Sequence, residues 1–291
     1  MKKFFIKGFT LCLSFLPLSV LRWLGGVVGV VAIQLSHRAH NRIKKNLLAT
    51  GMCDESNVER VAKKTSVEWG KTLIEAACIA WRRSSAYNAK LIVKAHGFTY
   101  MKECLLSGKP TVFLTPHIGN FEVALKYTAH KLSSRVFTIL YKPAKAKWLN
   151  QVMLEGRTEK NIKPVPTNRN GMFTLIKDLR ANGIVGVLPD SIASSGDGVW
   201  VDFFGQKTFA TTLAAKMTLT ENAHTFIVAS YRVKGGFEVD YIPFSPKSQH
   251  VGVVVQDIYR VIEEIILKAP EQYYWSYDRF RVPPHAPSIG G

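Results

Sequence analysis

Between residues 91 and 268, short apolar runs alternate with longer stretches of helical periodicity, and this alternation restricts the fold more than any other feature of the sequence. The apolar runs have the length of buried strands and lie at residues 91–93, 111–114, 136–141, 184–188, 226–229 and 237–242. Helical patterns lie between or after them, at residues 122–132, 172–181, 211–222 and 253–268. Because strands that alternate with helices build layered sheets, we expect one α/β domain with a central, mostly parallel sheet flanked by helices.

The sequence shows no internal repeat and no Pro-, Gly- or Ser-rich linker that would divide this domain. We therefore assign residues 37–282 to one domain and residues 283–291, which are rich in proline and glycine, to a frayed tail. Ahead of the first strand, apolar residues recur at three- and four-residue spacing up to Trp81, and Ser56-Asn57-Val58-Glu59 has the spacing of a capping box. We expect a long helix that begins there and lays one face on the core.

Residues 8–35 form an apolar stretch that is broken only by Pro17 and Arg22. As one helix the stretch would reach about 42 Å, more than the roughly 30 Å of a hydrocarbon core. Arg22, however, splits it into halves of about 13 residues, each shorter than the ~20 needed to cross alone. We assign residues 1–36 to a hydrophobic membrane-anchoring helix, and the sequence leaves open whether this helix spans the bilayer or lies in its surface. A cleaved secretory signal is disfavoured because no small-x-small cleavage site precedes Ser36.

The chain carries 39 Lys and Arg against 21 Asp and Glu, a formal net charge of +18, and therefore attracts phosphates. Nucleic acid and anionic lipid are the two candidate partners. The apolar N-terminus favours lipid, and no recognition-helix signature supports nucleic acid. Because the inner leaflet is anionic, the basic excess indicates the cytoplasmic face of a membrane. The 4 cysteines include no C-x-x-C pair, so we predict neither a metal site nor a disulfide framework.

The segment at residues 111–125 reads as a buried strand, a tight turn that carries His117, and a helix that begins near Asn120. Ligands of open α/β sheets bind at such strand ends. Glu122 falls in the first helical turn, where the helix dipole favours a carboxylate, and we expect it to fold back toward His117. The spacing alone is weak evidence, since the composition predicts about 0.6 accidental His-x-x-x-x-acid matches. The strand-turn-helix context is what makes the pair a candidate site.

A carboxylate beside a histidine fixes the tautomer of the imidazole and stabilises its protonated form. Such a histidine can accept a proton from an alcohol as the alcohol attacks a carbonyl, and no enzyme nucleophile or metal is required. We therefore predict acyl transfer, with His117 as the general base and Glu122 as its partner. A purely structural role for His117 stays open at this point, because a single motif match is only a hypothesis.

Over nearly its whole length the chain resembles the late acyltransferases of lipid A biosynthesis, the lauroyl and myristoyl acyltransferase group. The resemblance is carried by blocks that are specific in combination. They are Arg42-x-x-x-Asn46-Leu47, the His117 to Glu122 motif, Tyr141-Lys142-Pro143, Gly156-Arg157, Asn170-Gly171-Met172, Leu179-Arg180-x-x-Gly183, Leu188-Pro189-Asp190, residues 198–205 and Pro270-Glu271-Gln272-Tyr273.

The resemblance implies transfer of a fatty acyl chain from the thioester of acyl carrier protein to a hydroxyl of a lipid A precursor. That precursor is a phosphorylated, Kdo-bearing glucosamine disaccharide with four or five acyl chains. The resemblance also implies a bacterial inner-membrane location, at the cytoplasmic face, with no cofactor beyond the acyl donor. Arg157 and Asp190 match the family's other functionally important Arg and Asp, and we take them as substrate-binding residues. Arg157 would hold a phosphate or a carbonyl oxygen, and Asp190 backbone or sugar.

The chain departs from the family pattern at two positions. The family commonly has Tyr-Arg-Pro, and in this chain Lys142 replaces the arginine of that motif. The ammonium group of a lysine cannot make the bidentate phosphate contact of a guanidinium. Asp278, within Tyr277-Asp278-Arg279-Phe280-Arg281, stands where a basic residue is common, and we interpret this ending as a surface variation. Phe203-Phe204-Gly205 is interpreted as a packed corner or part of an acyl channel wall.

An acyltransferase that acts on a glycerophospholipid or another glycolipid is the alternative, since such enzymes share the His-x-x-x-x-acid motif. The blocks at Gly156-Arg157 and at residues 198–205 argue against it, because a different acceptor would be expected to need a different binding block. The sequence does not specify the length of the acyl chain, the acylated position on the disaccharide or the oligomeric state.

Overall fold

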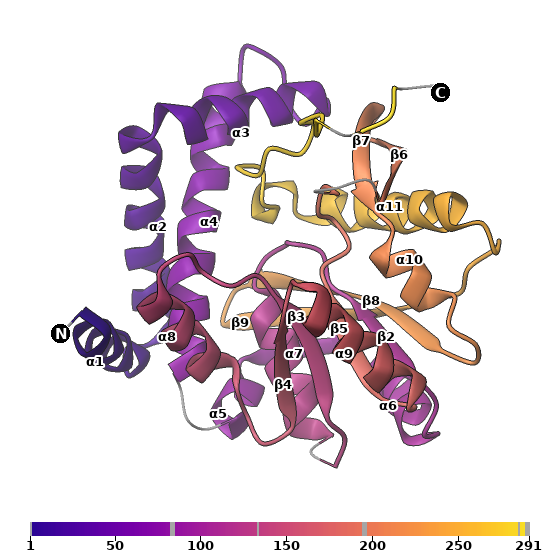
Figure 1. Ribbon diagram of the computed structural model, residues 1–291. Coiled ribbons are helices and arrows are strands. Elements are labelled where there is room, and N and C mark those ends of the chain that lie inside the picture. The colour runs from indigo at the N-terminus through magenta and orange to yellow at the C-terminus, as the bar shows by residue number, and fades with distance from the viewer. Residues whose placement is uncertain (1, 82–84, 133, 194–196, 285, 289–291) are drawn as a thin grey trace.

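A seven-stranded sheet forms the centre of the protein, in a computed structural model that describes residues 2–81, 85–132, 134–193, 197–284 and 286–288 (Figure 1). The strand order is β1-β9-β8-β2-β5-β3-β4. The strands are β1 (Ile92–His96), β2 (Thr111–Leu114), β3 (Phe137–Tyr141), β4 (Ile162–Pro166), β5 (Ile184–Val187), β8 (His224–Val233) and β9 (Gly236–Phe244).

Most neighbouring strands of this sheet are parallel. Strand β2 pairs in parallel with both β5 and β8, and β3 pairs in parallel with β4 and β5. Strands β8 and β9 form an antiparallel hairpin, and β1 runs parallel to β9. All four residues of β2 are buried, as expected for a strand covered on both faces. The predicted fold class, a mostly parallel sheet flanked by helices, is confirmed.

Each face of the sheet has its own hydrophobic core. Val112 and Leu114 of β2 belong to one core, while Phe113 between them belongs to the other, as the alternation of side chains along a strand requires. Helices α9 (Arg169–Arg180), α10 (Leu213–Thr218) and α11 (Val251–Lys268) contribute to the core of Val112. Helices α6 (Phe98–Leu106) and α7 (Phe121–Lys131) contribute to the core of Phe113.

Strands β6 (Gly198–Phe203) and β7 (Gln206–Thr211) form a separate two-stranded hairpin that packs against α11. Two backbone N–H groups of the hairpin donate hydrogen bonds to side chains of α11. Its turn is Phe204-Gly205, both with positive φ, as a two-residue hairpin turn requires. The helix predicted at residues 211–222 is shorter in the structure, because Thr211 ends β7 and α10 covers only Leu213–Thr218. Phe203 is fully buried in this corner, so the packed-corner interpretation is confirmed.

The N-terminal apolar stretch forms two helices, because Pro17 separates α1 (Lys2–Ser14) from α2 (Leu18–Leu35). Helix α3 (His37–Ala49) follows, and then the long α4 (Val58–Trp81), which runs beside α2 (Figure 1). Glycines bring α2 and α4 together: a Cβ on Gly29 would lie 2.0 Å from the carbonyl oxygen of Ser66. Within the described residues, α2 is the helix long and apolar enough to cross a membrane, which by itself is weak evidence of a span.

Two shorter helices, α5 (Ser85–Lys90) and α8 (Lys147–Arg157), and a 3-10 turn at Pro270–Gln272 complete the fold. Helix α4 begins as predicted, but the capping box needs correction. The Oδ1 atom of Asp54 accepts from the backbone N–H groups of Ser56 and Asn57, at 2.9 and 3.2 Å, so Asp54 stabilises the turn ahead of the helix. Glu59 instead forms salt bridges with Lys44 and His40.

Candidate active site

His117 lies on a tight turn between β2 and α7, at the carboxyl end of a central strand. The turn depends on Gly119, whose φ is +55° and whose added Cβ would lie 1.9 Å from the carbonyl oxygen of Ser230. A side chain would therefore be excluded both by backbone conformation and by space. Asn120 is the N-cap residue of α7, as predicted, although its side chain makes no capping hydrogen bond.

Hydrogen bonds from the C-terminal segment and from a side chain of α4 hold the backbone of this turn. The backbone N–H of Tyr274 donates to the carbonyl of His117 at 3.1 Å, and the N–H of Gly119 donates to the carbonyl of Gln272 at 3.0 Å. The hydroxyl of Thr72, from α4, donates to the carbonyl of Gly119 at 2.9 Å. The Pro270-Glu271-Gln272-Tyr273 block thus supports the backbone of the turn that carries His117. This contact is a structural reason for the presence of the block among the motifs.

The imidazole of His117 is paired with Asp190, which lies after β5, the parallel neighbour of β2. His117 Nδ1 is 2.8 Å from Asp190 Oδ1, and the backbone N–H of His117 donates to Oδ2 at 3.1 Å. Because an ionised carboxylate only accepts, Nδ1 carries the proton in this pair. In the neutral form of the ring, Nε2 then carries no proton and can accept one, which is the form a general base needs.

Asp190 is fully buried and held by two further side chains. The hydroxyl of Tyr273 donates to its Oδ2 at 3.0 Å, and Arg279 contacts both its carboxylate, at 3.4 Å, and its backbone carbonyl. Burial alone would raise the pKa of Asp190, but the charge and hydrogen bonds of His117 and the charge of Arg279 hold that pKa far below its ordinary value. Asp190 is therefore ionised at neutral pH. Its carboxylate contacts His117, Tyr273 and Arg279, and the substrate-binding role expected for it stays a prediction.

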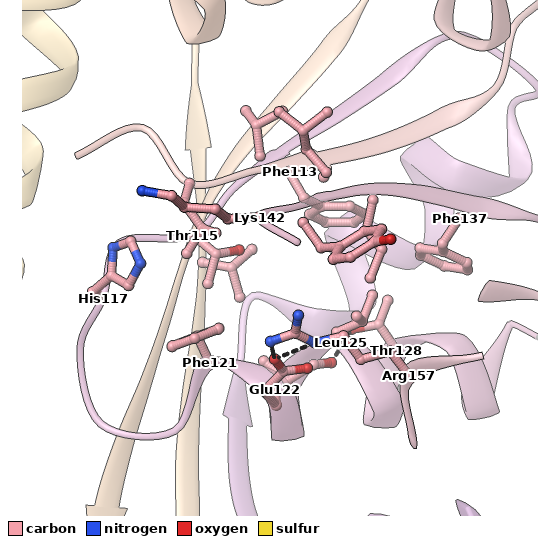
Figure 2. A pocket seen from close by; sticks show the side chains of 18 of the residues that line it. Phe113, Thr115, His117, Phe121, Glu122, Leu125, Thr128, Phe137, Lys142 and Arg157 are labelled. Atoms are coloured by element: carbon pink, nitrogen blue, oxygen red, sulfur yellow. Dashed lines mark hydrogen bonds and ion pairs between the residues drawn. The ribbon is translucent and has the colours of Figure 1, made fainter. Parts of the chain in front are cut away.

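Glu122 lies elsewhere, and the expected His117–Glu122 contact must be corrected. The carboxylate of Glu122 accepts from the Nε atom of Arg157 at 2.8 Å and from a terminal nitrogen of the same guanidinium. Figure 2 shows this pair well apart from His117. The side chain of α7 that packs against the imidazole is instead Phe121, with ring centroids 5.4 Å apart. The structure thus joins two predicted residues, Glu122 and Arg157, in an unpredicted pair.

A buried lysine holds the end of α8 that carries Arg157. Lys126, one turn after Glu122 on α7, is only 2% exposed, and its Nζ donates to the carbonyl of Gly156 at 3.1 Å and to Glu159 at 2.5 Å. A cation at the C-terminal end of a helix is favoured by the helix dipole. The end of α8 is therefore fixed to α7 at two successive turns.

An apolar cavity of about 230 Å³ opens beside His117, between α7 and the sheet (Figure 2). His117, Glu122, Lys142 and Arg157 contribute the imidazole and the charged side chains of its wall. The rest of the lining is mostly apolar and comes from α7, from α8 and from strands β2, β3, β5, β8 and β9 or the residues that follow them. It includes Phe113, Leu125, Phe137, Ile139 and Val228. The residues of the Phe203 corner are not among those that line it. A narrow apolar space that ends in a polar, cationic mouth suits a chain with a polar head.

Sequence reasoning missed Tyr273 and Arg279 as members of the site. Arg279 was part of an ending interpreted as surface variation, yet it is 1% exposed and packs over the rings of Phe203 and Tyr273. Asp278, in contrast, is partly exposed and lies 3.4 Å from Arg42. Among the described parts of the chain, no group of three or more His, Cys, Asp and Glu side chains is placed to hold a metal ion.

An α/β fold with a His–carboxylate pair at the mouth of an apolar cavity fits the class of acyltransferases that activate a hydroxyl beside an acyl chain. The model of the bacterial lipid A biosynthesis acyltransferases matches residues 1–282, and the chain belongs to this family. It is also similar to the lipid A biosynthesis lauroyltransferase of Escherichia coli (strain K12), with 22% identity over 285 residues, which cover 92% of this chain and 88% of that protein. The resemblance seen in the sequence motifs is confirmed.

Proposed function

We propose that the protein transfers a fatty acyl chain from the thioester of acyl carrier protein to a hydroxyl of a lipid A precursor. The acceptor would be a Kdo-bearing glucosamine disaccharide with four or five acyl chains, reached at the cytoplasmic face of a bacterial inner membrane. Family membership supports the reaction class and the glycolipid acceptor. The observation that carries the chemistry is the pairing of His117 with the buried, ionised Asp190 at the mouth of the cavity.

In this proposal the Nε2 atom of His117 accepts the proton of the acceptor hydroxyl. The hydroxyl oxygen attacks the thioester carbonyl and forms the new ester bond, and the C–S bond breaks. The proton then passes from Nε2 to the departing thiolate, which leaves as the thiol of the carrier. Asp190 orients the imidazole and stabilises its charged form, so neither a metal nor a covalent acyl-enzyme is required.

Arg157 and Lys142 supply the positive charge that this reaction needs at the mouth of the cavity. Negative charge develops on the thioester oxygen in the transition state, and fixed cations in a site shielded from water stabilise it strongly. The guanidinium of Arg157 is held in place by Glu122, so it is preorganised rather than mobile. Glu122 therefore contributes to transfer through Arg157, and either cation could bind a phosphate of the acceptor.

The apolar cavity would hold the acyl chain during transfer, with its thioester at His117. From Tyr141 at the mouth to Phe137, strand β3 rises about 13 Å, at roughly 3.3 Å per residue. An extended chain would lie along this length between Leu125 of α7 and the sheet. Burial of each methylene contributes about 0.8 kcal/mol to binding, so the cavity favours long saturated chains over short ones.

The exposed face of α2 supports attachment to a membrane. Trp23, Val27 and Val31 lie on one side of this helix and are 67%, 47% and 45% exposed. The opposite side packs against α4, so the helix presents an apolar stripe along the body of the protein. We propose that this stripe enters the bilayer surface while the basic domain faces anionic headgroups.

The proposed reaction is tested with purified protein in detergent, an acyl carrier protein thioester and the lipid A precursor. We expect His117→Ala to lower the rate of transfer by at least about 1,000-fold, because the general base and its proton path are lost. His130→Ala is the matched control, because His130 lies in α7, which follows the turn of His117, and does not line the cavity. This variant should retain activity. Transfer by His117→Ala at the wild-type rate would disprove the mechanism, and acylation of a glycerophospholipid in place of the precursor would favour the alternative acceptor.

A further inference from the structure

Arg22 interrupts the apolar helix α2, yet all three of its donor nitrogens bind the body of the protein. Its Nε donates to Glu75 of α4 at 2.7 Å, and its two terminal nitrogens donate to the carbonyls of Val233 and Gly236 at 2.6 Å each. Those carbonyls belong to the β8–β9 hairpin of the central sheet. Helix α2 is therefore attached to the domain through a charged side chain as well as through its glycine contacts with α4.

Glu75, the partner of Arg22, is a fully buried carboxylate between two guanidinium groups. Arg232 of β8 donates to it from Nε at 3.0 Å and from a terminal nitrogen at 2.6 Å, and a second terminal nitrogen of Arg232 donates to Glu68 at 2.6 Å. Burial alone would lower the pKa of Arg232, but the charges of Glu75 and Glu68 raise it. Each acidic side chain of the cluster therefore has a guanidinium partner, and each guanidinium has a carboxyl partner, as burial of such groups requires.

Two hydrogen-bonded routes connect Arg232 with the turn of His117. Arg232 donates to the hydroxyl of Thr72 at 2.9 Å, and that hydroxyl donates to the carbonyl of Gly119 at 2.9 Å. The backbone N–H of Arg232 also donates to the side chain of Gln272 at 2.7 Å, and the carbonyl of Gln272 accepts from the N–H of Gly119. Both hydrogen-bonding groups of the Gly119 backbone are therefore held by partners of Arg232.

We propose that Arg22 and Glu75 are positioning residues for His117, acting through Arg232 and Thr72 on the Gly119 backbone. The turn sets the direction in which the imidazole presents its Nε2 atom to the cavity. The N-terminal helix is then a part of the active-site scaffold and not an anchor that could be exchanged for another. The effect on transfer rests on the proposed function, but the effect on the imidazole itself does not.

The test compares Arg22→Gln with Arg135→Gln in the full-length protein, in detergent micelles that remove any need for membrane attachment. Arg135 is the matched control because it also donates to two backbone carbonyls, those of Leu105 and Asn182, at 2.6 Å each, but outside the network that holds the His117 turn. Two quantities are measured for each folded variant: kcat and KM for acyl transfer, and the pH dependence with which diethyl pyrocarbonate modifies His117, followed by peptide mass spectrometry.

We expect Arg22→Gln to lower kcat by roughly 10- to 100-fold, since a displacement of about 1 Å at a reacting group costs about 100-fold. KM should change by no more than about twofold, because the substrate contacts remain. The pH profile of His117 modification should shift in Arg22→Gln and stay at the wild-type position in Arg135→Gln. Arg22→Lys keeps the charge beside Glu75 but loses the two carbonyl contacts, so its kcat should fall between those of the wild type and Arg22→Gln.

An Arg22→Gln variant that is less stable, but has wild-type kcat per folded molecule and an unshifted His117 profile, would overturn the proposal. Should Arg22→Gln fail to fold, Arg22→Lys is judged by the same two measurements. A wild-type protein that transfers no acyl group would contradict the proposed function alone, since the reactivity of His117 still decides whether Arg22 positions it.

Discussion

At the scale of single residues, the carboxylate of Asp190 joins three segments of the chain that are far apart in sequence. It accepts hydrogen bonds from the turn after β2, through His117, and from the C-terminal segment, through Tyr273 and Arg279. A buried charge of this kind is tolerated only while its partners are present. Asp190 therefore stabilises the fold at the same place where it orients the imidazole of His117.

The stability contributed by Asp190 should depend on pH in a defined direction. Folding lowers its pKa below the unfolded value of about 3.9, so its contribution is complete above that pH and is lost as the pH falls toward the folded-state pKa. We expect Asp190→Asn to lower the free energy of unfolding by about 3–5 kcal/mol at pH 7, and by less at pH 3. Thermal or denaturant unfolding in detergent at both values measures this.

Asp202→Asn is the control for that measurement, because the side chain of Asp202 is 56% exposed and pairs with Lys207 on the surface. It should change stability by less than about 1 kcal/mol at either pH. An Asp190→Asn variant with the same loss at pH 3 as at pH 7 would contradict the assignment of an ionised Asp190.

The sequence indicated His117 but not its partner. The strand-turn-helix pattern around His117 was readable, whereas Asp190 lies 73 residues further along, beyond the reach of any local spacing rule. Topology contains the missing signal: His117 follows β2 and Asp190 follows β5, and these parallel neighbours end at the same edge of the sheet. The nearest acid in sequence, Glu122, was assigned in place of the nearest acid in space.

At the scale of elements, the contact between α7 and the end of α8 fixes Arg157. Glu122 and Lys126 lie one turn apart on α7, and each binds the last residues of α8 or the residues that follow it. Two successive contacts prevent the end of α8 from rotating, so Arg157 keeps its place in the cavity wall. A loss at one contact should therefore be felt at the other.

Lys126→Met keeps the length of the side chain but leaves the carbonyl of Gly156 and the carboxylate of Glu159 without their cation. We expect it to lower the free energy of unfolding by about 3 kcal/mol, because a buried pair is broken. It should also reduce kcat, through a less ordered Arg157. Lys102→Met, at an exposed position of α6, should change stability by no more than about 0.5 kcal/mol. Equal stability of the two variants in a melting experiment would contradict the role given to Lys126.

The elements that sequence patterns missed have identifiable physical reasons. Strand β4 contains Pro164 and Pro166, which argue against a strand, but β4 lies at the edge of the sheet beside β3, where proline is tolerated. Helix α8 begins within a basic run, Lys142, Lys145 and Lys147, that is typical of a solvated surface. This run hid the amphipathic pattern of the helix from the sequence-based prediction. The buried central strands, β2 and β5, were predictable because both of their faces are apolar.

Across the molecule as a whole, the segment at residues 1–36, expected to be an anchor, is packed against the domain at residues 37–282. Helix α2 shares a glycine-rich contact with α4, and Arg22 binds the central sheet. The exposed stripe of α2 is apolar, and the opposite side of the helix packs against the rest of the protein. The sequence indicated a membrane segment from hydropathy alone, but the tertiary contacts of Arg22 had no signal in the sequence.

In the proposed reaction this chain adds one acyl group to a lipid A precursor, with His117 as the base. Mass spectrometry of lipid A from cells that lack the chain, and from the same cells complemented with wild type or His117→Ala, tests this reaction in the cell. We predict that wild type restores one acyl group and that His117→Ala leaves lipid A one acyl group short. If His117→Ala restored the acyl group, the proposed role of His117 would be contradicted. If loss of the wild-type chain left lipid A unchanged, the proposed reaction would be contradicted.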